Sequence, residues 1–108
     1  MASPELQQGN LELLILKTLA SGALHGWAIS RHIHKVSGEL LTVGQGSLYP
    51  ALYRLEDRGL VKAAWGVSPE GRRAKFYSLT ATGRAQLSRQ SAAWRAYIGA
   101  IDLVLQAP

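Results

Sequence analysis

The sequence contains no cysteine and few other residues that carry chemistry. Without thiols, neither a disulfide framework nor a thiolate metal site can form. The seven carboxylates and three histidines form no familiar catalytic arrangement. His32 and His34 are two positions apart on a predicted helix, so they point in different directions and cannot share a metal ion as an i, i+4 pair could. We therefore predict a protein that is not an enzyme and that binds neither a metal nor a cofactor.

Long apolar runs are also missing. No stretch is long and apolar enough to cross a bilayer, and residues 1–8 do not combine a basic start with an apolar run. Together with the absence of cysteine, these features predict a cytoplasmic protein with no membrane partner. A membrane-surface role for the last predicted helix is a weak alternative, because its basic residues stop at Arg95 while its apolar end continues to Leu105.

What the sequence does have is an excess of positive charge. The net charge is +5 over 108 residues, and the pI is about 10.0. Such a surface attracts nucleic acid, an anionic membrane or an acidic protein, and charge alone does not choose among them. The length suits one domain, and its core must be small because there is one Phe and one Met.

Three helices are predicted in the first part of the chain. Residues 11–19 are almost all apolar and lack Gly and Pro, which indicates a helix buried on most sides. The next apolar side chains recur at i, i+4 and i+7, which indicates an amphipathic helix with a core stripe at Ile29, Ile33 and Val36. A third helix is predicted to begin at Ser47, whose hydroxyl suits an N-cap, and to end before Gly59, which suits the left-handed position after a helix.

A hairpin and a long helix are predicted to follow. The β-prone stretches 61–65 and 74–79 flank a segment that contains Gly and Pro. Thr80 is an N-cap candidate for a helix that continues to about Leu105. The order of helix, helix, helix, hairpin and long helix is that of a winged helix-turn-helix. We therefore predict a mainly α fold with a small β-hairpin.

The third helix carries the most informative side chains. With its leucines turned inward, it leaves outward Ser47, Tyr49, Pro50, Tyr53 and Arg54. In a DNA major groove, an arginine can donate two hydrogen bonds to a guanine edge, and a tyrosine can reach phosphates or a thymine methyl. The pattern predicts a DNA-reading helix. The alternative is that one of the two tyrosines packs against the hairpin or the second helix.

Basic side chains gather in two other places. Arg72 and Arg73, with Lys75, put positive charge at the tip of the predicted hairpin, where a wing lies along the sugar-phosphate backbone. Arg31 and Lys35 on the second helix are further candidates for phosphate contacts. The alternative is that these charges are simply solvated.

Three segments resemble one known family. Residues 46–61, GSLYPALYRLEDRGLV, resemble the recognition helix of PadR-family transcriptional regulators, and residues 72–83, RRAKFYSLTATG, resemble the family's second wing strand and the entry to its last helix. Residues 24–29 are similar to its Gly-containing entry to the second helix, although Trp27 stands where Tyr is frequent. The likeness covers about residues 9–105.

The resemblance implies a winged helix-turn-helix repressor, dimeric through its first and last helices. Such a protein would bind double-stranded DNA at a near-palindromic operator and could be released from it by a small molecule. The DNA-contacting positions that it implies are Ser47, Tyr49, Pro50 and Arg54 on the helix, and Arg72, Arg73 and Lys75 on the wing.

The last helix also predicts a homodimer from its own apolar seam, which is too broad for one small domain to cover. We therefore divide the single domain, residues 1–108, into a winged helix-turn-helix part at 9–79 and a C-terminal dimerisation helix at 80–105. The alternative is that this helix folds back on its own domain. The predicted dimer interface consists of Leu11, Leu14, Ile15, Leu87, Trp94, Tyr97, Ile98, Ile101 and Leu105.

Trp94 and Trp27 raise the question of an effector. Aromatic side chains at an interface can stack on a small aromatic or hydrophobic compound, although a packing role is the preferred explanation for both residues. Two function classes remain open: a sequence-specific DNA-binding regulator, and a winged-helix module that binds another protein and does not read DNA.

Overall fold

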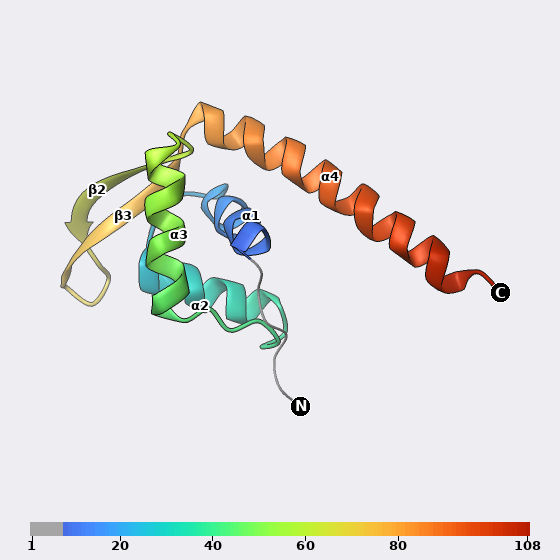
Figure 1. Ribbon diagram of the computed structural model, residues 1–108. Helices are drawn as coiled ribbons and strands as arrows, with labels where there is room; N and C mark the ends of the chain where they lie inside the picture. The colour runs from blue at the N-terminus through green and yellow to red at the C-terminus, as the bar shows by residue number, and fades with distance from the viewer. Residues whose placement is uncertain (1–7) are drawn as a thin grey trace.

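The computed structural model describes residues 8–108, so the prediction about an export signal in residues 1–8 lies almost entirely outside it. Four helices and three strands follow one another along the chain (Figure 1). They are α1 (Gln8–Leu19), β1 (Leu24–His25), α2 (Gly26–Val36), α3 (Gln45–Asp57), β2 (Val61–Val67), β3 (Arg73–Leu79) and α4 (Ala81–Gln106). The predicted fold class, a mainly α winged helix-turn-helix with a long last helix, is confirmed.

The first three helices enclose the core. Leu48, Leu52 and Leu55 of α3 are fully buried against Ile15 and Leu16 of α1, as the i, i+4, i+7 spacing predicts. On α2, Ile29 and Ile33 are also buried. Val36 is not: its side chain is 66% exposed, so its predicted place in the core is wrong. It is the last residue of α2 and lines a hollow between this helix and Leu14 and Thr18 of α1.

The sheet has one strand more than predicted. Its order is β1-β3-β2, with both pairs antiparallel, and Leu24 and His25 of β1 lie opposite Tyr77 and Phe76 of β3. A two-residue strand is too short to produce alternation in the sequence, so periodicity could not reveal it. The hairpin strands are also slightly longer than predicted, with Val67 paired to Arg73 at the end nearest the tip.

The two ends of α3 differ in how well the sequence predicted them. The helix begins at Gln45 after Gly44, so Ser47 lies inside the first turn and is not the N-cap; Gly44 supplies no side chain that could cap the helix. The end is as predicted. Gly59 has a φ of 73°, and the N–H of buried Leu60 donates to the Leu55 carbonyl at 2.9 Å, which is a Schellman-type end.

The start of α4 is joined to this same turn. The Thr80 hydroxyl accepts a hydrogen bond from the Gly83 N–H at 3.0 Å, which confirms Thr80 as N-cap, and donates to the Gly59 carbonyl at 2.7 Å. A Cβ at position 83 would collide with the backbone carbonyl oxygen of Leu60. The packing thus requires a residue without a side chain at this position, in addition to the ordinary loss of helix propensity at a glycine.

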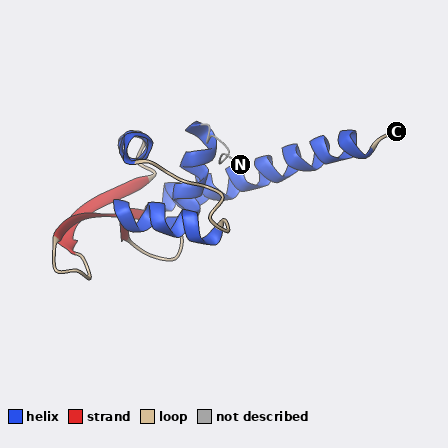
Figure 2. Ribbon diagram, turned by 90° about the horizontal axis from the view of Figure 1, so that it is seen from below, coloured by secondary structure: helices blue, strands red, loops and turns tan. Residues whose placement is uncertain are grey.

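Beyond its first turns, α4 leaves the rest of the molecule. Every residue from 92 to 106 is exposed, and Figure 1 shows this part, which we call the arm, extending away from the other helices. Figure 2 shows the sheet and the arm at opposite ends of the molecule. The alternative in which this helix folds back on its own domain is therefore wrong. Within residues 8–108, no helix combines the length and apolar character needed to span a membrane.

Candidate nucleic-acid interface

One continuous surface joins the exposed side of α3 to one face of the sheet. Side chains directly opposite each other on antiparallel strands share a face, and alternate residues of a strand do too. Lys75 and Arg73 of β3 therefore share a face with their partners Trp65 and Val67 of β2. We call this the recognition surface: exposed Ser47, Tyr49, Pro50 and Tyr53 of α3 together with Trp65, Arg72, Arg73 and Lys75 of the wing.

Tyr49 and Tyr53 differ in how the fold holds them. A Cβ built at Gly26 would lie 2.8 Å from the Tyr49 hydroxyl, so this ring rests on the first residue of α2 and is 38% exposed. Tyr53 is 64% exposed, with the Lys75 ammonium 5.8 Å from its ring centroid. The alternative that one tyrosine packs against the second helix thus holds for Tyr49, while part of its ring stays accessible.

Lys75 lies two residues from the tip end of β3, but its charge is directed toward α3 and not into the tip, where the sequence predicted it. Its Nζ is 3.8 Å from a Glu56 carboxylate oxygen and also lies over the ring of buried Tyr77 at 5.8 Å. The ion pair links the sheet to α3 and offsets part of the positive charge of Lys75, although a partly exposed pair of this kind adds little to stability. Burial, reinforced by Glu56 and by Tyr53 nearby, raises the pKa of Tyr77 above 10.0.

The tip of the wing is basic, as predicted, and ordered by its own hydrogen bonds. Ser68 and Arg72 close it: the Ser68 N–H donates to the Arg72 carbonyl at 2.7 Å, and the Arg72 N–H donates to the Ser68 hydroxyl at 3.2 Å. Arg72 and Arg73 are exposed. The Arg73 guanidinium lies over the Trp65 ring, 4.9 Å from its centroid, and Trp65 is itself 61% exposed.

Arg54 is not the free outward side chain that the sequence predicted. Its Nε lies 3.0 Å from Oε2 of Glu12 on α1, and the second oxygen of Glu12 lies 3.0 Å from Nη1 of Arg58. Helical geometry places residues 54 and 58 on the flank of α3 next to α1. This flank lies beside the face that carries Tyr49 and Tyr53. A contact between Arg54 and a guanine would require this arginine to leave Glu12.

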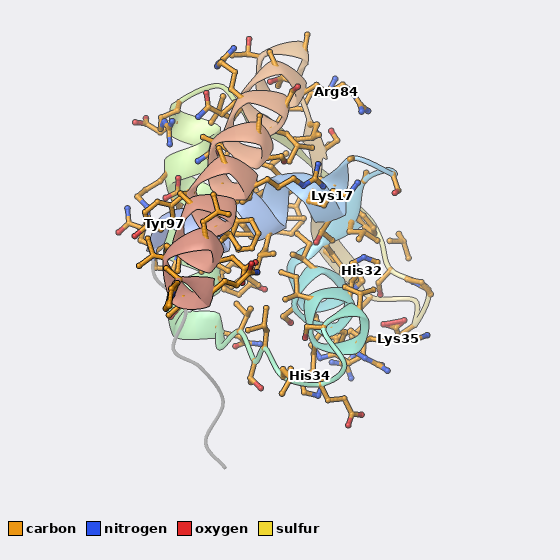
Figure 3. The ribbon with its side chains drawn as sticks, turned by 90° about the vertical axis from the view of Figure 1, so that its right-hand side faces the viewer. Lys17, His32, His34, Lys35, Arg84 and Tyr97 are labelled. Atoms are coloured by element: carbon orange, nitrogen blue, oxygen red, sulfur yellow. The ribbon has the colours of Figure 1, made fainter. Side chains whose placement is uncertain are left out.

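Arg31 and Lys35 are exposed on α2, as predicted, and border a hollow between this helix and the segment that leads to α3. The Arg31 guanidinium lies over the Trp27 ring at 4.7 Å from its centroid. In Figure 3, Lys35 lies with His32 and His34 along α2. These cations are thus separate from the basic tip of the wing.

The predicted dimer residues fall into three groups. Leu11 and Ile15 are 3% and 0% exposed inside the protomer's own core, so their assignment to an interface is wrong. Leu14 and Leu87 are partly buried against that core. The remaining residues form an exposed apolar seam on the arm: Trp94, Tyr97, Ile98, Ile101 and Leu105.

The hollow beside Trp27 does not include Trp94. It is lined by Leu24 of β1 and by residues of α2 from Trp27 to Lys35, and no residue of α4 takes part in it. Trp94 is 43% exposed on the arm. Among the residues that the structure describes, no three potential metal ligands of the His, Cys, Asp or Glu type gather at one place.

Sequence reasoning missed Glu12. It is the single acidic residue in α1, between leucines, and its side chain is 7% exposed. A lone carboxylate inside an apolar helix is itself a signal, because a buried charge needs a partner. The identity of its partners could not be read from the sequence, since they lie 42 and 46 positions away.

Comparisons with known proteins agree with this geometry. A family model described as the transcriptional regulator PadR-like family matches residues 15–89. A transcriptional regulator of Mycobacterium tuberculosis is 38% identical, with 78% of this chain and 75% of that protein covered. The chain is also 42% identical over 86 residues to an uncharacterised 37.1 kDa protein of a Streptomyces fradiae transposon, covering 80% of this chain but 23% of that protein.

A solved structure resembles the whole fold. The PadR-like transcriptional regulator of Bacillus cereus superposes with a TM-score of 0.80 at 27% identity, and 94% of this chain and 96% of that chain are covered.

Proposed function

This chain belongs to the PadR-like family of transcriptional regulators, and we propose that it is a repressor that binds a near-palindromic operator as a homodimer, acts in the cytoplasm and catalyses no reaction. The recognition surface is the observation that supports DNA reading. Exposed Tyr49, Pro50 and Tyr53 on α3 would enter the major groove, while Arg72 and Arg73 would lie along the backbone.

The wing and α2 would supply most of the attraction to phosphates. The three charged residues of α3 are Arg54, Glu56 and Asp57, and the first two are already paired within the protomer. The exposed cations on the wing and on α2 are then available for phosphate contacts: Arg72, Arg73, Arg31 and Lys35. We propose that these position the protein on DNA and that the exposed side of α3 provides the sequence preference.

The exposed seam on the arm supports the homodimer. An apolar row at 94, 98, 101 and 105 follows the spacing of a helix that packs against another helix. A second copy would cover it and place two recognition surfaces on one side of the assembly, as a two-fold operator requires. The exposed indole of Trp94 in this seam is the feature that supports release by a small aromatic or hydrophobic effector bound between the two arms.

Fluorescence anisotropy against tiled duplexes from the upstream region of the protein's own gene tests the proposal. We expect tight binding to one duplex. Tyr53→Ala should weaken this binding about tenfold or more and reduce the preference for that duplex. Arg72→Ala should weaken all duplexes alike and reduce the salt dependence by about one phosphate contact. Arg95→Ala, on the arm, is the matched loss of one cation and should change neither.

Weak and equal binding to every duplex would contradict sequence reading. In that case the alternative, a winged-helix module that uses the same surface to bind a protein, would take precedence.

A further inference from the structure

We propose that Glu12 is a positioning residue that limits non-specific DNA binding by holding Arg54 and Arg58 against α1. The inference rests on the proposed DNA-binding function. It concerns two cations that lie on the recognition helix or at its end and yet are directed away from the tyrosine face.

The geometry of the three side chains supports a fixed arrangement. Both carboxylate oxygens of Glu12 are used, each 3.0 Å from one guanidinium, and Gln8 lies 3.4 Å from one of these oxygens. The Glu12 side chain is 7% exposed, whereas those of Arg54 and Arg58 are 37% and 51% exposed. The carboxylate is thus held inside the protomer, and each arginine remains close enough to the surface to reach a phosphate if it were released.

Charge explains why releasing them would matter. Glu12 neutralises one of the two arginine charges and fixes the position of both. Without its carboxylate, two mobile cations would lie beside the recognition helix, where the phosphate backbone of any bound duplex would run. Each additional phosphate contact adds to affinity for every sequence alike and makes binding more dependent on salt. Glu12 therefore favours discrimination between sequences over total affinity.

The main test is Glu12→Gln, which keeps the shape of the side chain and removes its charge. Binding to a mixed-sequence duplex is measured by anisotropy between 50 and 300 mM salt, where we expect affinity about five- to tenfold higher at about 0.1 M salt. The slope of log K against log salt should steepen by about one to two, and the ratio of operator to mixed-sequence affinity should fall. Asp102→Asn on α4 also removes one negative charge, but away from the recognition surface. It should leave the slope and the affinity ratio unchanged.

A purely structural role for Glu12 gives a different result. In that case Glu12→Gln would lower the melting temperature while the salt slope and the operator preference remain those of the wild type, and the proposal would be overturned. The double variant Glu12→Gln with Arg58→Gln restores the local net charge, and its slope should return toward that of the wild type.

Arg58→Gln alone gives a test that does not require the Glu12 variant to fold. If Glu12 already keeps the Arg58 guanidinium away from DNA, Arg58→Gln should change mixed-sequence affinity by less than about twofold and leave the salt slope unchanged. Arg72→Gln should instead reduce the salt slope by about one. An equal reduction in both variants would show that Arg58 contacts phosphates in the wild type and would overturn the proposal. Absence of any DNA binding by the wild type at 50 mM salt would instead contradict the proposed function itself.

Discussion

The winged part of the chain and the arm differ in where their apolar side chains lie. Residues 8–79 bury most of their leucines and isoleucines within the protomer, with Leu40, 63% exposed, as an exception, and even Tyr77 is only 3% exposed. In the arm, residues 92–106, no side chain is buried. Even the apolar side chains of Leu103, Val104 and Leu105 are 71–77% exposed. The winged part therefore has a core of its own, whereas the arm presents an apolar surface that our proposal covers with a second copy.

Helix α4 belongs to both regions, because its start packs against the winged part and its second half forms the arm. The first turn of α4 is fixed by Thr80 and by the close approach of Gly83 to the Leu60 carbonyl, while residues 92–106 are all exposed. Substitutions in the first turn should therefore act on folding, and those in the arm should act on association.

The largest effect should come from Gly83→Ala, compared with Gly99→Ala in the same helix. A Cβ at position 83 meets backbone, which cannot move without opening the junction between α3, β2 and α4, whereas a Cβ at position 99 meets nothing within 4 Å. We expect Gly83→Ala to lower the free energy of unfolding by about 3 kcal/mol or more. Gly99→Ala should be neutral or stabilising by up to about 1 kcal/mol. Urea unfolding followed by circular dichroism measures both, and equal effects would contradict the close contact.

The next effect concerns association. Ile101→Ala removes a side chain from the seam, and Leu103→Ala removes one from the other side of the arm, two residues away. We expect Ile101→Ala to raise the dimer dissociation constant at least about tenfold, because each dimer loses two buried side chains. Leu103→Ala should change it little. Sedimentation equilibrium gives these constants, and a wild-type protein that stays monomeric at tens of micromolar would contradict the assignment of the seam.

The same division explains what the sequence could predict. The Leu48, Leu52 and Leu55 stripe was predicted correctly because spacing decides which side of a helix faces the core, whereas Val36 shows that spacing does not tell where along a helix the cover ends. Capping at Thr80 and the end at Gly59 were also correct, since both depend on local backbone chemistry. The two-residue strand β1 was missed because it exists only through its pairing with β3.

The candidate site was predicted in composition but not in contacts. Tyr53, Arg72 and Arg73 are exposed, as their sequence positions indicated. The pairing of Arg54 with Glu12 was invisible, because it depends on how α1 crosses α3. Ion pairs between residues far apart in sequence require the tertiary structure, and so does the burial of Leu11 inside the protomer, where the sequence predicted an interface.

The smallest effect concerns the pH dependence of stability. It compares buried Tyr77 of the winged part with exposed Tyr97 of the arm. Burial, followed by the charge of Glu56, raises the pKa of Tyr77 above 10.0, so the folded protein holds this proton more tightly than the unfolded chain does. The resulting stability is fully present below pH 10 and is lost as the pH rises through the folded-state pKa. Tyr77→Phe should therefore weaken the decline in melting temperature between neutral pH and pH 11, whereas Tyr97→Phe, which removes a phenol from the arm, should leave that decline in place. Identical alkaline profiles for the wild type and Tyr77→Phe would show that Tyr77 does not contribute to it.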